Sequence, residues 1–502
     1  MRLPRASGVL LHPTSLPGPH GSGDFGASAY HFVDWLVSGG QTLWQILPLG
    51  GIGPGNSPYM STSAFAGNLL LVDLAELHEQ GWLDAADLTP ATGLEAARVN
   101  FAAVVPFRMQ RLERAAGRFA AMGTAAQRAE FEAFCAEQHS WLDDYTLFMA
   151  LYEAHSYRDW CDWEPALAAH KPPALAKARL EHAERIAFWQ FAQWCFFRQW
   201  RKLRAYANGR GVQIVGDAPI FIAHQSAEVW AHPQLFELDA NGRPTVVAGV
   251  PPDFFSATGQ RWGNPLYRWS VHAADGYAWW IERVRRIFEL VDVVRIDHFR
   301  GFAGYWEIPA NEPTAEKGRW VPGPGHRLFQ AIADALGDLP IIAEDLGVIT
   351  PDVVALRKDF NLPGMRILQF AFAGDASDRF LPHNHEPDSV IYTGTHDNDT
   401  VAGWWATADD RERHYVRGYL GTDGHDMPWA MIRAAAMSVA DTAIHPLQDV
   451  LSLPGSCRMN FPGKAEGYWE WRFQWNEVQP WHAQRLAEFG RLYGRPMRDP
   501  AT

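Results

Sequence analysis

Short apolar runs recur along this chain, and most are followed by turn residues and then by a segment of helical periodicity. Large apolar residues repeat at about every third or fourth position over 186–203, 276–290 and 325–336, which predicts three amphipathic helices. Strands that alternate with helices indicate a parallel sheet. The apolar runs are eight candidate strands, at 8–11, 42–47, 212–215, 291–296, 340–343, 366–370, 389–392 and 443–444.

Eight such units predict an α/β fold of the (β/α)8 TIM barrel class with inserted, mainly helical subdomains. A barrel of this kind takes about 250 residues, so roughly half of the 502 residues must lie in insertions. We expect one barrel over 1–502, a helical subdomain at 69–185, and smaller insertions at 225–275 and 302–325 around the barrel mouth. A doubly wound open sheet is the alternative, but the chain has no glycine-rich phosphate-binding motif to support it.

Composition narrows the possible functions. The net charge is −13 and no long basic run is present, which argues against nucleic acid as a partner. The N-terminal apolar run is short, so we expect no signal peptide, no membrane partner and a cytoplasmic location. The cysteines are scattered without C-x-x-C spacing, which indicates a reducing compartment and no disulfide framework; they are Cys135, Cys161, Cys195 and Cys457.

Aromatic residues are unusually frequent, with 23 Trp, 28 Phe and 14 Tyr. Most of them are expected to build large cores. Some are candidates for stacking against flat, weakly polar ligands such as sugar rings, whose C–H faces pack on aromatic faces.

Acidic residues follow four of the candidate strands. In a (β/α)8 barrel the carboxyl ends of the strands meet at one rim, and chemistry is located there. An acid after a strand is often only a helix cap, but four converging on one rim are harder to explain by capping. The residues are Asp217, Asp297, the pair Glu344 and Asp345, and the pair Asp397 and Asp399.

The segment VVRIDHFRG, residues 293–301, carries the sharpest signal. Residues two apart in a strand share a face, so Arg295 should lie beneath Asp297. The positive charge should favour the ionised carboxylate and lower the pKa of Asp297, which suits a nucleophile. A purely structural ion pair is the alternative.

Glu344 follows an apolar strand, and desolvation there should raise its pKa so that it stays protonated near neutral pH. Two carboxyl groups with separated pKa values are the apparatus of glycoside cleavage. Asp397 is a candidate third group, binding sugar hydroxyls and stabilising positive charge. His298 and His396 are candidate hydroxyl-binding imidazoles, although core or capping roles are the alternative. The chain shows no metal-ligand spacing, and we expect neither metal nor cofactor.

Several motifs together resemble one family, the 4-α-glucanotransferases of glycoside hydrolase family 77, also called amylomaltases or disproportionating enzymes. The match extends over nearly the whole chain. Its motifs are GVLLHPTSLPG, WQILPLG, NSPYMSTSAFAGN, GDAPIFIAHQSAEVWAHPQLF, GVPPDFFSATGQRWGNPLY, VRIDHFRGF, IIAEDLG, GTHDNDT and RMNFPG.

The resemblance implies a retaining mechanism and a role for each matching residue. Asp297 would be the nucleophile, Glu344 the acid/base and Asp397 the transition-state stabiliser. The two reacting carboxyl groups should then be about 5–5.5 Å apart. The substrate-binding residues implied are Tyr59, Asp217, Phe254, Trp262, Arg295, His298 and His396, with 251–262 forming a loop over the site.

The implied reaction transfers a segment of a maltooligosaccharide, amylose or other α-1,4-glucan to the 4-hydroxyl of another glucan or of glucose. An α-1,4-glucan hydrolase with the same three carboxyl groups is the main alternative, because the carboxyl groups do not decide whether water or sugar is the acceptor. A glucan-binding protein without catalytic activity is a second alternative. It would have no reason to keep all three acids at strand ends.

Overall fold

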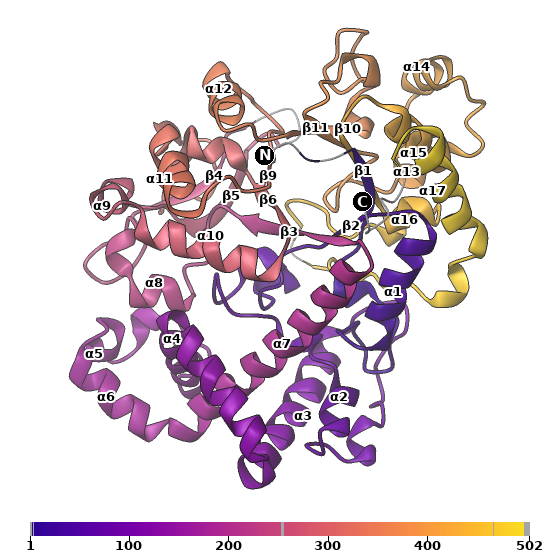
Figure 1. Ribbon diagram of the computed structural model, residues 1–502. Coiled ribbons are helices and arrows are strands. Elements are labelled where there is room, and N and C mark those ends of the chain that lie inside the picture. The colour runs from indigo at the N-terminus through magenta and orange to yellow at the C-terminus, as the bar shows by residue number, and fades with distance from the viewer. Residues whose placement is uncertain (1–2, 4, 253–255, 465, 496–502) are drawn as a thin grey trace.

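A closed barrel of eight parallel strands forms the centre of the computed structural model, which describes residues 3, 5–252, 256–464 and 466–495 (Figure 1). The predicted (β/α)8 class is confirmed. Around the barrel the strands run in the order β1, β12, β11, β10, β9, β6, β3, β2. Their bounds are β1 Ala6–Leu10, β2 Leu43–Gln45, β3 Gln213–Pro219, β6 Val293–Asp297, β9 Ile341–Ala343, β10 Gly364–Ile367, β11 Ser389–Tyr392 and β12 Thr442–Pro446.

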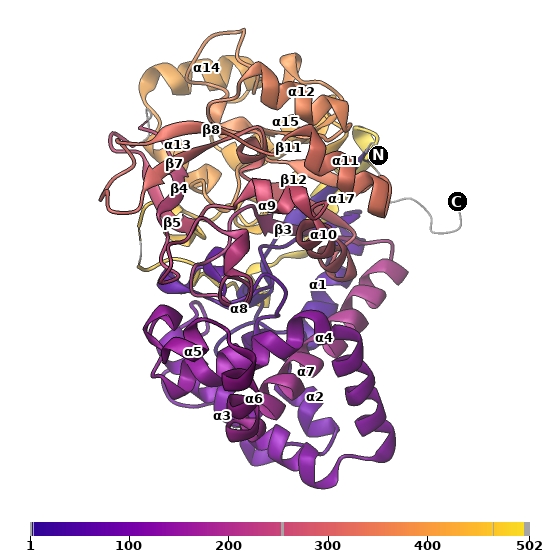
Figure 2. The same ribbon diagram turned by 90° about the vertical axis from the view of Figure 1, so that its left-hand side faces the viewer.

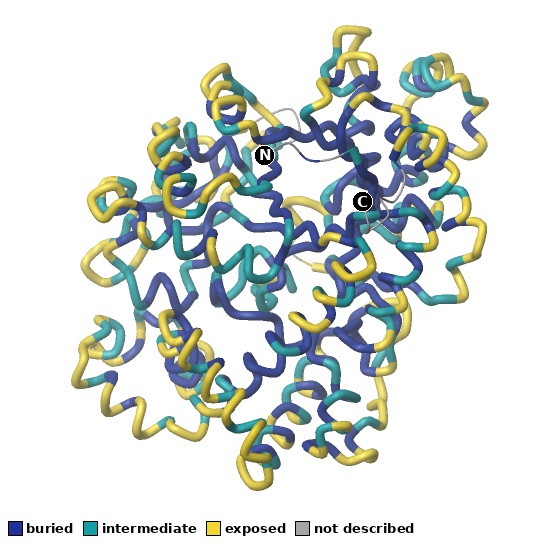
Figure 3. The backbone as a smooth tube through the Cα atoms, in the orientation of Figure 1, coloured by how far each residue is buried: buried dark blue, intermediate teal, exposed yellow. Residues whose placement is uncertain are grey.

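The barrel strands are almost wholly buried, as parallel strands covered on both faces should be (Figure 3). Each of the eight apolar runs contributes to one strand; β11 has the predicted bounds, and the other seven differ at one or both ends. β3 continues to Pro219, so Asp217 lies within the strand and not after it. β10 ends at Ile367, and residues 368–370 form a 3-10 turn instead of more strand.

Helices surround the barrel. The three helices predicted from periodicity are present as α7 Ala183–Gly209, α10 Ala278–Leu290 and α11 His326–Leu336. The other helices outside the large insertion are α1 Ala27–Ser38, α8 Ala227–Ala231, α9 Trp269–Ala274, α12 Pro351–Asp359, α13 Val401–Thr407, α14 Asp410–Leu420, α15 Met427–Met437, α16 Leu447–Val450 and α17 Pro480–Leu492. Among the described residues, no helix combines the length and apolarity needed to cross a membrane.

The long connection between β2 and β3 is built of helices that extend to one side of the barrel (Figure 2). Aromatic contacts join them, for example Trp141 with Phe197 at 5.8 Å between ring centroids and Trp82 with Trp194 at 5.4 Å. Many of the aromatic residues therefore serve packing here. The helices are α2 Leu74–Glu79, α3 Phe101–Met122, α4 Ala125–Ala154, α5 Pro165–Ala168 and α6 Pro172–Glu181, after which α7 leads into β3.

A second, antiparallel sheet lies among the connections that follow β3 and β6. Its strand order is β5, β4, β7, β8, and the hydrophobic pattern did not predict it. The strands are β4 Val246–Val250, β5 Gln260–Pro265, β7 Gly304–Pro309 and β8 Arg319–Pro322. The sheet joins the two segments expected as small insertions, 225–275 and 302–325, and brings Trp262 to the barrel mouth beside His298. The division of the chain into barrel and insertions itself remains an interpretation.

Candidate active site

Arg295 is the central cation of the site. It lies in β6 with a side chain only 4% exposed, and its Nη1 donates to both carboxylate oxygens of Asp217 at 2.8 Å. Its Nη2 donates to Oδ1 of Asp297, also at 2.8 Å. Burial alone lowers the pKa of Arg295, but the two carboxylates outweigh it and the net shift is upward. One guanidinium therefore holds two carboxylates, and sequence reasoning anticipated only the contact with Asp297.

Tyr59 and His396 extend this network on the side of Asp217. The Tyr59 hydroxyl donates to Oδ2 of Asp217 at 2.8 Å and lies 2.8 Å from Nε2 of His396. Because the Tyr59 O–H donates its hydrogen bond to Asp217, the phenol oxygen must accept the hydrogen bond from an Nε2–H of His396. The two rings stack with centroids 5.4 Å apart. Burial, followed by the charge of Asp217, raises the pKa of Tyr59 far above its ordinary value, which keeps the phenol neutral.

Glu344 follows β9 directly and has a different environment. Its Oε2 accepts from the N–H of His298 at 2.7 Å, and its Oε1 accepts from the N–H of Leu346 at 2.9 Å. Burial raises the pKa of Glu344 to about 8; Arg295 opposes this shift and Asp297 adds to it. An upward shift of the pKa is what the sequence predicted for a carboxyl group at the end of an apolar strand.

The neighbouring acids Asp345 and Asp399 do not join the site. Asp345 is buried, accepts from the N–H of Met365 at 2.7 Å, and lies 3.5 Å from Arg357 and 3.6 Å from Arg366. Asp399 accepts from the N–H of Thr400 at 2.8 Å. Both therefore make structural contacts, and neither is the N-cap of a helix: Asp345 contacts β10 and two arginines, and the N-cap of α13 is Thr400.

Asp397 is held from a distant part of the chain. Its Oδ1 accepts from the side-chain amide of Asn460 at 2.7 Å, and its carbonyl accepts from Nη2 of Arg458, also at 2.7 Å. Nε2 of His396 is 3.5 Å from the same Oδ1. Sequence reasoning missed Asn460 as a site residue, although it stands in the RMNFPG motif. Only the fold shows that this motif meets Asp397.

His298 lies against two aromatic residues at the barrel mouth. Its ring is edge-on to Trp262, with centroids 4.8 Å apart, and 6.4 Å from Phe221. Burial lowers the pKa of His298 to about 4, so the imidazole is neutral in ordinary buffers. Within the part of the chain that the structure describes, its Nε2 has no hydrogen-bond partner. That nitrogen is also buried, so among the described residues it lacks both a protein partner and access to solvent. Phe254, the other predicted stacking residue, lies outside the described residues.

Arg300, the last charged residue of the VVRIDHFRG segment, belongs to the support of the site. Its Nη1 donates to the carbonyl of Val348 at 2.7 Å and its Nε to that of Gly304 at 3.3 Å. Its guanidinium also lies 3.8 Å from the centroid of the Trp320 ring. Arg300 therefore ties the connection after β6 to the one after β9 and to the antiparallel sheet.

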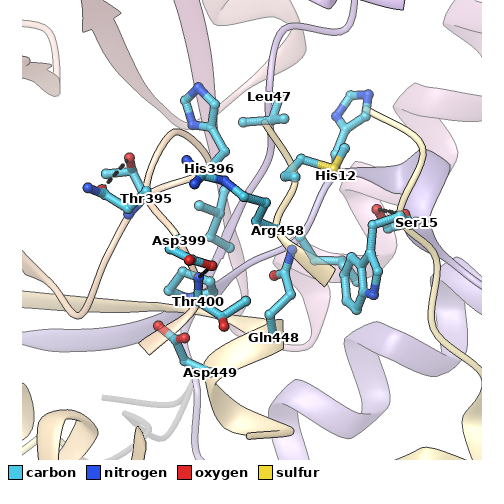
Figure 4. Close-up of a pocket in the computed structure, with 16 residues that line it drawn as sticks. His12, Ser15, Leu47, Thr395, His396, Asp399, Thr400, Gln448, Asp449 and Arg458 are labelled. Carbon is cyan, nitrogen blue, oxygen red and sulfur yellow. Dashed lines mark hydrogen bonds between the residues drawn. The ribbon is translucent and has the colours of Figure 1, made fainter. Parts of the chain in front are cut away.

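A small cavity adjoins the site behind His396 (Figure 4). Its lining includes His12, Asp449 and Arg458, together with His396 itself. Burial, followed by the charge of His396, lowers the pKa of His12 to about 3, and burial raises that of Asp449 to about 6. Both groups are therefore pushed toward their neutral forms. No cluster of three or more His, Cys, Asp or Glu suited to a metal ion occurs among the described residues.

Comparison with known proteins shows which family the chain belongs to. A family model described as 4-alpha-glucanotransferase matches residues 11–478. The chain belongs to this family. It is 50% identical over 494 residues to the 4-alpha-glucanotransferase of Thermus thermophilus, covering 97% of this chain and 98% of that one. It is 48% identical over 495 residues to the enzyme of the same name from Synechocystis, covering 98% of both.

A solved structure shows the same architecture. The amylomaltase from Streptococcus agalactiae, in complex with acarbose, superposes with a TM-score of 0.95 and is 38% identical, covering 98% of this chain and 100% of that one. The resemblance to the 4-α-glucanotransferases seen in the motifs is therefore confirmed. The match with the family model contains every site segment described above, from Tyr59 to Asn460.

Proposed function

We propose that this family member is a retaining 4-α-glucanotransferase in which Asp297 is the nucleophile, Glu344 the acid/base and Asp397 the transition-state stabiliser. One observation carries the assignment. Two carboxyl groups at the ends of adjacent barrel strands have opposite environments, Asp297 paired with a guanidinium and Glu344 raised to a pKa of about 8. A carboxylate paired with a cation suits a nucleophile, and a carboxyl group whose pKa is raised by burial suits a proton donor.

The first half-reaction cleaves the donor glucan. Glu344 gives its proton to the glycosidic oxygen as the bond from that oxygen to the anomeric carbon breaks, and Asp297 attacks the carbon from the other side. The products are a covalent glycosyl-enzyme and a shortened glucan with a free 4-hydroxyl. Asp397 faces the positive charge that develops at the anomeric carbon. The side-chain amide of Asn460 donates to Oδ1 of Asp397 and so orients this carboxylate.

The second half-reaction reverses the roles. Glu344, now ionised, takes the proton of the acceptor's 4-hydroxyl while that oxygen displaces Asp297 from the anomeric carbon. Two inversions retain the α configuration. We propose maltooligosaccharides, amylose and other α-1,4-glucans as donors, and these or glucose as acceptors. Hydrolysis would use the same groups, with water in place of the sugar.

Incubation with maltotriose tests the reaction. Maltooligosaccharides longer than maltotriose, together with glucose, indicate transfer, whereas maltose and glucose without longer products indicate hydrolysis. The residue roles are tested with an α-maltosyl fluoride donor, whose leaving group needs no proton. Glu344→Gln should still form a covalent glycosyl-enzyme that mass spectrometry detects, and Asp297→Asn should not. Full activity of Asp297→Asn on maltotriose would disprove the assignment. The cytoplasmic location expected from the sequence remains a prediction.

A further inference from the structure

The backbone ladder between β6 and β9 is irregular where the proposed nucleophile and acid/base meet. The N–H of Glu344 donates to the carbonyl of Ile296 at 3.1 Å, which continues the strand register. A regular parallel ladder would next join the carbonyl of Glu344 to the N–H of residue 298. That carbonyl accepts instead from the N–H of Phe299 at 3.2 Å. The chain after β6 therefore contains one residue more than the ladder needs, as in a β-bulge.

His298 provides this extra residue by adopting a left-handed conformation, with φ 52° and ψ 45°. L-residues adopt this region at a steric cost, which histidine tolerates better than β-branched residues do. The turn removes the N–H of His298 from the ladder and directs it to Oε2 of Glu344 at 2.7 Å. A backbone distortion beside a reacting group, held in place by a tight hydrogen bond, is typical of functional strain.

The environment of Glu344 shows what this N–H does. Its two oxygens accept from two neutral main-chain donors, the N–H groups of His298 and Leu346. The charged groups that act on it are Arg295, which lowers its pKa, and Asp297, which raises it, while burial is the largest effect and raises it. Each main-chain donor stabilises the ionised carboxylate and orients it. The ionised form is the one needed to accept the proton of the incoming sugar.

We propose that His298 is a positioning residue that acts on Glu344 through its main chain. The left-handed conformation at position 298 holds the N–H that orients the Glu344 carboxyl group and stabilises its ionised form. This inference rests on the proposed function, because it takes Glu344 to be the acid/base. It makes the conformation of residue 298, and not only its imidazole, a requirement of the reaction.

A matched set of variants separates the main chain from the ring. His298→Gly and His298→Val both remove the imidazole, but only glycine adopts a φ near 52° without strain, and valine strongly resists it. The alkaline limb of kcat/KM reports the pKa of the group that must be protonated in the free enzyme. We expect His298→Gly to keep the wild-type limb. His298→Val should move it upward by about one pH unit, the effect expected from losing one of two main-chain donors.

Equal alkaline limbs in the glycine and valine variants would overturn the proposal. If the valine variant does not fold, His298→Ala takes its place, with a smaller upward shift expected relative to glycine. Equality of alanine and glycine would then be the contrary result. Full activity of Glu344→Gln on maltotriose would instead refute the proposed function, whatever the order of the His298 variants.

A fluoride donor distinguishes positioning of Glu344 from general damage to the site. Fluoride leaves the anomeric carbon without being protonated, so formation of the glycosyl-enzyme from α-maltosyl fluoride does not need Glu344 as an acid. The glycine and valine variants should therefore form the glycosyl-enzyme from α-maltosyl fluoride at the same rate. If the valine variant is slower by the same factor with both donors, residue 298 acts on the whole site and the proposal fails.

Discussion

Replacing Arg295 with methionine would remove the cation that Asp217 and Asp297 share, while keeping a long side chain of similar shape. The side chain of Asp217 is 0% exposed, and that of Arg295 is 4% exposed. Removing one partner of a buried ion pair leaves an unpaired charge, at a cost of about 3–5 kcal/mol. For 502 residues the unfolding entropy is about 1 kcal/mol/K, so Arg295→Met should lower Tm by about 3–5 °C.

The loss of stability in Arg295→Met should be smaller at low pH than at neutral pH. Burial raises the pKa of Asp217 above 3.8, and Arg295 opposes that shift. Without Arg295 the folded-state pKa rises further above the unfolded value. The stability of the variant is then fully present below about pH 4, where the carboxyl group is protonated in both states, and is lost as pH rises through the folded-state pKa. Calorimetry at pH 4.5 and pH 7.5 should therefore show a smaller deficit at the lower pH.

Two further variants make the interpretation specific. Asp217→Asn in the Arg295→Met background removes the more deeply buried of the two unpaired charges and should restore at least half of the lost Tm at pH 7.5. Arg319→Met breaks the ion pair of an arginine that is 77% exposed and should cost about 0.5 kcal/mol or less. A Tm for Arg295→Met within 1 °C of the wild type, or no recovery in the double variant, would show that the shared cation does not stabilise the barrel.

Three other outcomes follow from the site. The kcat/KM for maltotriose should fall above pH 8, because burial raises the pKa of Glu344 to about 8 and Glu344 must be protonated to act as the acid. A flat profile to pH 10 would contradict this prediction. Asn460→Ala should lower kcat by about 10- to 100-fold with KM little changed, since it removes the amide that directs Asp397. Asn460→Asp should lower kcat more than Asn460→Ala does, and its kcat should recover partly in acid. Unchanged kcat in both variants would exclude a positioning role. Trp262→Ala should raise KM for maltoheptaose far more than Trp262→Phe does, and equal values would argue against stacking.

The eight barrel strands could be predicted because each is a short apolar run whose burial on both faces leaves a mark in the sequence. In the antiparallel sheet only β4, which reads VVAGV, is a comparable apolar run, and β5 and β8 leave no such mark. Residues 260–265 read QRWGNP and residues 319–322 read RWVP, mixtures of charged, aromatic, glycine and proline residues in which no face is continuously apolar. β5 and β8 each pair with a neighbouring strand of their own connection, and the pairing of β4 with β7 joins the two connections. That last pairing depends on contacts between residues far apart in the chain.

The site was predictable to the same degree. Asp297 ends β6, and Glu344 and Asp397 come after β9 and β11; the barrel topology alone places these strand ends at one rim. The contact between Arg295 and Asp217 depends on the pairing of β6 with β3, in which these two residues are register partners. Asn460 stands 63 residues after Asp397, in a segment without α-helix or strand that follows α16. Neither contact could be derived from spacing along the chain.

The two proposed reacting carboxyl groups differ in the kind of partner that the fold gives them. Asp297 is paired with a guanidinium that a second carboxylate also holds. Glu344 must lose and regain a proton in every cycle. A fixed cation bonded to it would hold one state and slow the exchange, whereas two main-chain N–H groups orient the carboxyl group in both states and favour the ionised one only moderately. A group held by neutral donors in a buried site, with a pKa of about 8, can exchange its proton near neutral pH. On this reasoning the irregular backbone at His298 is part of the catalytic design, because a regular β6–β9 ladder would leave Glu344 with one main-chain donor fewer.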